Sequence, residues 1–403
     1  MELVFYKWVE FSVAVAVGNK AQASALWDAF AEVPLIGVPH NLPYNHGTIA
    51  LLIERGEVAE AQACIDRWRE TLAGMGSTCL SYNLDLMQAY VLMARGDSTV
   101  VAVLKTALTS AAAYGFYGNL CWIPQMMRPL CALALREGIE PDFVVELIRR
   151  KRLSAPAGAL HWAWPIRVYA LGRFAVFRDR EQLRFAHRPQ HRPLELLQAI
   201  IASGGAGTTS SQLKNWLWPD AEGDAANNAL NATLHRLRKL LGEPAAVVVD
   251  DGRVWLNAEI CWVDAFAFDQ AASRILSNQA SESNGEDVVR LYSGHFLGSE
   301  VDTSWAMTYR DRLRAKFQRL VTAIAGQLER QHRWHQAADL YRRALEVDNL
   351  QEESYRRLMV CLRECSEIAE AKNVYRRCSQ MLSIVLGVKP SPETTAVFQG
   401  LPD

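Results

Sequence analysis

The sequence predicts a mainly α fold in which two arrays of helical repeats flank a small central domain that contains β-strands. In residues 1–152, and again in residues 262–403, apolar side chains recur at spacings of three and four, the period of an amphipathic helix. Around residue 166 the pattern changes to β-branched and aromatic residues in alternation, the period of a strand. Half of the 403 residues are apolar and 22% are charged, as in ordinary globular chains.

Residues 1–152 are predicted to form a first domain of TPR-like helical hairpins. One helical pattern, at 49–72, breaks at Gly56, and a second, at 90–111, breaks at Gly96. Repeated hairpins of this kind bury one face on the next hairpin. No cluster of charged or polar residues in this segment indicates chemistry.

A linker is predicted at 153–165, because Ser-Ala-Pro-Ala-Gly and Pro165 interrupt regular structure. Just before it, residues 149–152 form a basic run. Such a run either contacts nucleic acid or ends a helix, where the helix dipole favours cations; the second use is the commoner one.

The central domain is predicted over residues 166–260. A strand is expected at 166–179, with 181–185 as its hairpin partner. Three helices are expected at 192–205, 208–219 and 224–241, the last followed by Gly242. Asp251-Gly252 then joins two short apolar runs, which is the strongest short-range signal of a β-hairpin. This order is that of a winged helix-turn-helix with an N-terminal sheet.

The helix expected at 224–241 carries the candidate site. Leu230, Leu234, Leu237 and Leu241 share one face, which must be buried. Polar side chains fall on or near the opposite face: Asp224, Asn227, Asn228, Asn231, His235, Arg236, Arg238 and Lys239. Asparagine pairs with adenine and arginine with guanine, so this face suits DNA bases. The alternative is a plain solvent-exposed face, which every amphipathic helix has.

Residues 261–403 are predicted to be helical again, with helices at 304–331, 333–348, 351–365 and 368–387. Arginine pairs recur at 342/343, 356/357 and 376/377. Nearby Asp and Glu side chains favour a salt-bridged surface over a basic face.

Composition excludes several classes of protein. No apolar run approaches the 18 residues of a membrane helix. The eight cysteines form no CxxC pair, which favours small buried side chains in a reducing cytoplasm. No metal site, nucleophilic triad or phosphate-binding loop stands out, so neither a cofactor nor an enzymatic activity is expected. The Trp162/Trp164 and Trp216/Trp218 pairs indicate packing more than a ligand cage.

Charge is unevenly distributed. The whole chain has a formal charge of −1, but residues 167–257 hold 12 basic and 9 acidic side chains. This modest excess indicates a polyanionic partner for the central domain.

Several motifs resemble a known family. "LGRFAVFRD", "LWPDAEGDAANNALNATLHRLRKLLG" and "DDGRVWLN" resemble the OmpR-type winged helix of SARP/AfsR-like regulators. "WAMTYRDRLRAKF", "AADLYRRALEVD" and "LGVKPSPETTAVF" are similar to the bacterial transcriptional activator domain that follows it, here 261–403. The first segment resembles the helical repeats of MalT-like activators only in general character.

The resemblance implies that the third helix enters the major groove. By position, it implies base contacts by Asn227, Asn228, Asn231, His235, Arg236 and Arg238. It implies phosphate contacts by Lys239, by Arg253 at the wing, and by the helix N-terminus at Thr208, Thr209, Ser210 and Ser211. The helix begins with neutral Asn and the wing carries two Asp, so one copy is expected to bind DNA weakly.

The sequence therefore predicts a cytoplasmic transcriptional regulator, most simply an activator, that binds double-stranded promoter DNA. Its helical repeats would mediate homodimerisation, signal input or contact with RNA polymerase subunits. The alternative is a scaffold whose degenerate winged helix binds protein or a small nucleotide signal.

Overall fold

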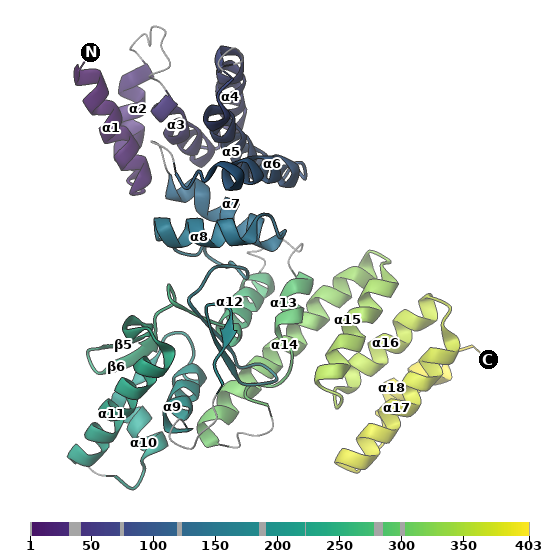
Figure 1. Ribbon diagram of the computed structural model, residues 1–403. Coiled ribbons are helices and arrows are strands. Elements are labelled where there is room, and N and C mark those ends of the chain that lie inside the picture. Colours follow the sequence, from purple (N-terminus) through teal and green to yellow (C-terminus); the bar gives the residue numbers. More distant parts are fainter. Residues whose placement is uncertain are drawn as a thin grey trace. The chain divides into compact units, whose positions relative to one another are not determined.

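The computed structural model describes residues 2–31, 42–72, 76–118, 123–184, 191–221, 223–277, 285–298 and 303–402. The chain divides into two compact units, Met1–Ala163 and Trp164–Asp403. Both are dominated by helices, and strands occur only in the second among the described residues, so the predicted mainly α class is confirmed (Figure 1).

The first unit is an array of helices. They are α1 Glu2–Ala16, α2 Lys20–Ala31, α3 Leu42–Glu54, α4 Val58–Leu72, α5 Thr78–Arg95, α6 Val100–Tyr114, α7 Pro124–Arg136 and α8 Pro141–Lys151. The two predicted breaks are confirmed. At Gly96 the backbone turns with φ +67°, and its N–H caps carbonyls of α5.

The basic run at 149–152 lies at the C-terminus of α8. Arg150 donates to Glu146 at 2.7 Å, and its guanidinium stacks on the ring of Tyr117. The helix-end interpretation of this run is therefore supported, since cations are favourable at that end of the helix dipole.

The second unit begins with a four-stranded sheet in the order β3-β2-β1-β7. Its strands are β1 Ile166–Tyr169, β2 Ala175–Arg178, β3 Glu181–Gln182 and β7 Cys261–Val263. β1 pairs antiparallel with β2 and parallel with β7. The single strand predicted at 166–179 is wrong, because the chain turns between β1 and β2.

A buried carboxylate explains the turn. Asp264 is 2% exposed and accepts hydrogen bonds from the backbone N–H groups of Ala170, at 2.8 Å, and Leu171, at 3.1 Å. Gly172 follows with φ +80°, and a Cβ there would lie 3.1 Å from the Ser293 carbonyl oxygen. The strand therefore ends where its N–H groups are redirected to a residue far along the chain.

The winged helix-turn-helix follows in the predicted order. The predicted start of its second helix at 208 is wrong, because Thr208 and Thr209 pair with Val254 and Arg253 as a strand. Its helices are α9 His191–Ala202, α10 Ser210–Leu217 and α11 Gly223–Leu241. A short 3₁₀ turn at Pro244–Ala246 leads into the wing, a three-stranded sheet in the order β4-β6-β5, with β4 Thr208–Thr209, β5 Val247–Asp250 and β6 Arg253–Leu256. Asp251 and Gly252 both have positive φ, as a two-residue hairpin turn requires.

The remaining helices form the C-terminal array. They are α12 Asp264–Leu276, α13 Gly285–Leu291, α14 Ser304–Arg330, α15 Trp334–Val347, α16 Glu352–Glu364, α17 Ile368–Leu386 and α18 Pro392–Gln399. As predicted, acidic partners meet the arginine pairs: Arg342 contacts Asp339 at 2.9 Å, and Arg357 pairs with the buried Glu329.

One hydrophobic core runs through the whole second unit. It extends from Ile166 in β1 through Leu237 in α11 and Phe317 in α14 to Leu401. The winged helix and the C-terminal array are therefore packed together rather than tethered.

Candidate nucleic-acid interface

Helix α11 separates its apolar and polar residues as the sequence predicts. Leu230, Leu234, Leu237 and Leu241 are at most 4% exposed and pack into the core. On the opposite side Asn228, Asn231, His235 and Lys239 are all exposed. We call these four residues the polar ridge. Their spacings of three and four place them in one row along the helix.

The edges of α11 are occupied by contacts within the protein. Arg238 is half-buried and donates from Nε at 3.1 Å and from Nη2 at 2.8 Å to the carbonyl oxygen of Val247 in β5. On the same edge, the Oδ1 of Asn227 accepts from the Nζ of Lys214 at 2.8 Å. These two residues therefore fasten α11 to the wing and to α10.

Arg236 lies on the other edge and is exposed. Its Nε donates to the Ala232 carbonyl within the same helix at 3.3 Å, a long bond that leaves the guanidinium facing solvent. Of the three cations near the end of α11, Arg236 and Lys239 are thus exposed and Arg238 is engaged.

The wing presents mixed charge. Arg253 is exposed, sits opposite Asp250 in the hairpin register, and donates to the Ala206 carbonyl at 3.0 Å. Asp250 and Asp251 are exposed at the tip. A phosphate approaching Arg253 would therefore meet two nearby carboxylates, which weakens the attraction.

Much of the predicted phosphate-binding helix N-terminus is already hydrogen-bonded. Thr208 is 4% exposed and donates to Gln212 Oε1 at 2.8 Å. Thr209 caps α10 by accepting from the Gln212 N–H at 3.2 Å. The Ser210 N–H donates to the Gly252 carbonyl at 2.8 Å, whereas Ser211 is exposed. The Ser210 amide is therefore committed to the wing.

Lys214 is a candidate that sequence reasoning missed. It precedes α11 by a turn and a loop, and nothing in its local pattern distinguishes it from any lysine on a short helix. Only the packing of α10 against α11 brings its Nζ to Asn227.

The described residues show no metal-binding group of three or more His, Cys, Asp or Glu side chains. None of the helices in the described ranges combines the length and apolar character that a membrane span requires.

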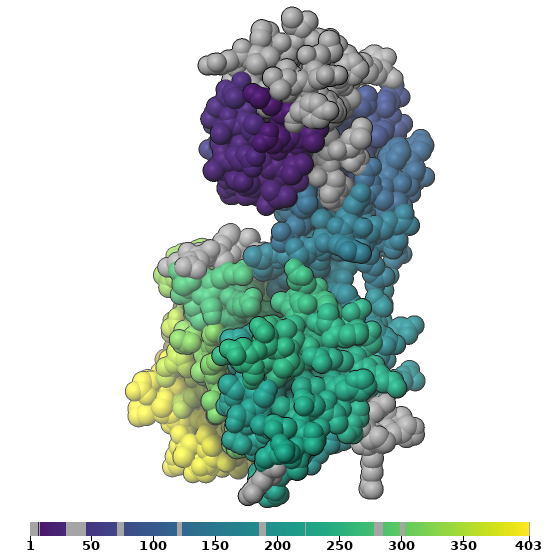
Figure 2. All heavy atoms as spheres, turned by 90° about the vertical axis from the view of Figure 1, so that its left-hand side faces the viewer, coloured from purple at the N-terminus to yellow at the C-terminus, as the bar shows by residue number. Residues whose placement is uncertain are grey.

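Figure 2 shows the face of the second unit on which the teal and green residues of the winged helix form the surface, beside the yellow-green C-terminal helices. On α11 and the wing hairpin, the polar ridge, Arg236 and Arg253 are exposed and match base or phosphate chemistry.

Comparison with known proteins adds a family for the C-terminal part. Residues 263–401 match the family described as bacterial transcriptional activator domain, about a third of the chain. No curated protein matches the chain. Among solved structures, the chain is similar to Mycobacterium tuberculosis EmbR in complex with a low affinity phosphopeptide, with 18% identity and a TM-score of 0.42.

The EmbR similarity covers 58% of this chain and 64% of that one, so it spans less than two thirds of EmbR. The chain is also similar to the TPR domain of P58(IPK), with 12% identity and a TM-score of 0.19, over 89% of this chain and 87% of that one. The domain match points to a regulator of transcription rather than to an enzyme. Residues 263–401 thus carry the match to the bacterial transcriptional activator domain, and the chain resembles SARP-like transcriptional regulators with helical repeats.

Proposed function

We propose that this protein regulates transcription by binding promoter DNA with the polar ridge of α11 in the major groove. The observation that carries the proposal is the exposure of Asn228, Asn231 and His235 in one row, directly opposite the buried leucines. A helix fits the major groove, and exposed amides and imidazoles are the groups that read base edges there.

The ridge divides into two roles in this proposal. Asn228 and Asn231 read bases, each able to pair bidentately with adenine, and His235 adds a further donor or acceptor. Lys239, Arg236 and Arg253 hold phosphates, together with the exposed start of α10 at Ser211. Asn227 and Arg238 position the helix, since their side chains are bonded to Lys214 and Val247.

The small number of exposed cations on α11 and the wing hairpin argues for more than one copy on the DNA. Arg236, Lys239 and Arg253 are opposed there by Asp250 and Asp251, which leaves little electrostatic attraction on this face. A homodimer, or a contact with RNA polymerase subunits, supplies the missing affinity. The helical arrays at 1–152 and 261–403 are the parts proposed for these contacts and for signal input, in a cytoplasmic protein.

The second candidate function is a scaffold whose winged helix binds protein. Its support is the mixed charge of the wing, where Asp250 and Asp251 oppose phosphate binding. The two functions differ in whether duplex DNA of a defined sequence is retained.

The test is selection from a pool of random duplexes with the full chain at two salt concentrations. We expect enrichment of a motif that contains adenine at one fixed position, as a repeat or palindrome. Asn231→Ala should reduce the preference for that adenine by about tenfold, the cost of one bidentate base contact. Asn373→Ala, which removes an exposed helical asparagine of α17, serves as the matched control and should leave the preference for that adenine unchanged.

If duplexes were retained without any enriched motif, and their retention fell steeply with salt, the protein would contact only phosphates. That result would contradict base reading. No retention of any duplex at the lower salt concentration would favour the scaffold.

A further inference from the structure

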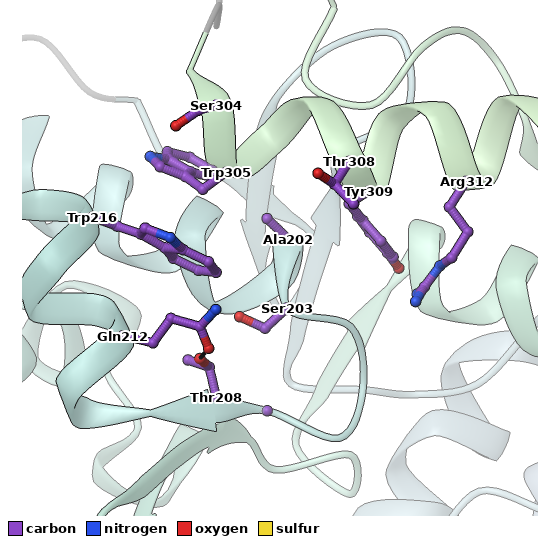
Figure 3. A pocket seen from close by; sticks show the side chains of 11 residues that line it. Ala202, Ser203, Thr208, Gln212, Trp216, Ser304, Trp305, Thr308, Tyr309 and Arg312 are labelled. Carbon is purple, nitrogen blue, oxygen red and sulfur yellow. Dashed lines mark hydrogen bonds between the residues drawn. The ribbon is translucent and has the colours of Figure 1, made fainter.

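A cavity of about 370 Å³ lies where the winged helix meets the C-terminal array. One wall comes from the end of α9, from β4 and from α10, and the other from the first turns of α14 (Figure 3). The volume lies within the range of small-molecule sites, which often form at such junctions.

Aromatic rings form one side of the cavity. Trp216 of α10 and Trp305 of α14 lie 6.2 Å apart between ring centroids, with 27° between their planes. Trp305 is buried and Trp216 is half-buried, so the pair offers indole surface to a planar group. The predicted packing role of Trp216 holds, because its ring contacts α14, and that ring also lines the cavity.

A buried hydroxyl also lines the cavity. Tyr309 is 3% exposed, and its hydroxyl makes no well-formed hydrogen bond in the structure. Burial raises the pKa of Tyr309, which opposes ionisation, while the neighbouring Arg312 lowers it. A neutral phenol in this position is a donor for an oxygen placed in the cavity.

Positive charge lies on the side opposite the tryptophans (Figure 3). Arg312 contacts the carboxylate of Asp269 at 3.3 Å, and Lys316 contacts that same carboxylate. Two cations therefore share one anion. Among the described residues that line the cavity, Arg312 is the charged one, and its guanidinium also lies 4.8 Å from the ring centroid of Tyr309.

Hydroxyl and amide groups complete the lining. Thr308 and Ser304 are exposed on α14, and Figure 3 shows Gln212 across from them on α10. The Gln212 Oε1 accepts from Thr208, which fixes the orientation of its amide. The cavity thus combines an apolar aromatic side, a cationic side and neutral polar groups between them.

We infer that this cavity binds a small planar aromatic molecule that carries a carboxylate. Its ring lies against Trp216 and Trp305, and its carboxylate accepts from Arg312 and from the Tyr309 hydroxyl. The planar guanidinium of arginine can donate two parallel hydrogen bonds to a carboxylate. The indole faces can stack on many different planar rings, so they do not specify one heterocycle.

The site has a consequence for the protein because its walls belong to different parts of one unit. A ligand that touches both α10 and α14 stabilises the arrangement in which they are packed as observed. Ligand binding would therefore be coupled to any rearrangement between the winged helix and the C-terminal array. The strength of the coupling is set by the ratio of the ligand's affinities for the two arrangements.

The experiment uses the full chain and two probes that differ only in charge, indole-3-acetate and indole-3-acetamide. Ligand-observed NMR titrations should give a dissociation constant of about 1 mM or below for the acetate, as expected for so small a molecule. The acetamide should bind about tenfold more weakly, because it lacks the charge that Arg312 recognises.

Two variants distinguish binding at this site from nonspecific binding elsewhere on the protein. Arg312→Gln should weaken the acetate to the level of the acetamide and leave the acetamide unchanged. Arg319→Gln, which removes an exposed arginine of α14 outside the cavity lining, should leave both unchanged. If Arg312→Gln lowers the melting temperature, Tyr309→Phe is used, since it removes the other donor to the carboxylate, and it should weaken the acetate selectively.

Equal binding of the two probes, equal weakening of both by Arg312→Gln, or no binding of either would overturn the inference. None of these outcomes involves DNA, so they leave the proposed regulatory function untouched.

Discussion

Arg238 tests whether a polar residue on α11 reads DNA or holds the domain together. The sequence predicts a base contact, whereas the structure joins Nε and Nη2 of Arg238 to the Val247 carbonyl oxygen at 3.1 and 2.8 Å. A hydrogen bond from a charged donor contributes about 1.5–3 kcal/mol. The substitution Arg238→Ala should therefore destabilise the attachment of β5 to α11 by about 2 kcal/mol.

Amide hydrogen exchange is the suitable assay, because it reports on the wing separately from the rest of the chain. A loss of about 2 kcal/mol increases the open population of β5 and β6 about 30-fold, and exchange there should accelerate by that factor. Arg236→Ala removes an exposed arginine of the same helix and should leave exchange in the wing within twofold. If the wing of Arg238→Ala exchanged at the wild-type rate and the variant lost its preference at one base pair, the structural role would be refuted. Arg238 would then be a base-contacting residue, as the sequence predicts.

Two further substitutions address the fold. Burial raises the pKa of Asp264 to about 7, so the folded protein retains a proton that the unfolded chain releases above about pH 4. Between pH 4 and pH 7, the unfolding free energy of the wild type should consequently fall relative to that of Asp264→Asn, as measured by denaturant titration at each pH. If the wild type instead became more stable relative to Asp264→Asn over this range, the N–H bonds from Ala170 and Leu171 would dominate. Gly207→Ala should lower the unfolding free energy by about 2–4 kcal/mol, since Gly207 has φ +74° and a Cβ would lie 2.5 Å from the Val254 carbonyl oxygen. Gly205→Ala, where a Cβ meets open space, is its control in thermal melts, and an equal effect of the two would contradict the steric argument.

Local patterns were sufficient to predict the three helices of the central domain and the hairpin of its wing, although not the strand at Thr208–Thr209. The leucines of α11 recur at helical spacing, so its buried side follows from the sequence, and the structure begins the helix one residue earlier, at Gly223. Asp251-Gly252 specifies the hairpin turn because both positions require positive φ. In each case the information lies within a few residues of the feature.

Features that depend on distant partners were not predictable. Residues 170 and 171 leave the strand pattern because Asp264, more than ninety positions later, accepts their N–H groups. The pairing of β7 with β1 crosses the predicted boundary at 260, and it is parallel, so no turn signals it. The engagement of Arg238 has the same origin, since it depends on where β5 packs and not on the helix itself.

The continuous core determines how a regulatory signal would reach α11 under the proposed function. Contacts between β1 and β7, between α9 and α14, and between Leu171 and Phe296 join the winged helix to the C-terminal array at several points. Because protein interiors are close-packed, elements joined in this way shift together or exchange between discrete packings. Under the proposed function, a partner bound to the C-terminal helices would act on α11 through the packing of α14 on α9 and of α9 on α11, rather than through a flexible linker. To act in this way, the partner would have to change the packing between α14 and the winged helix. The cavity between α10 and α14 lies at that same junction.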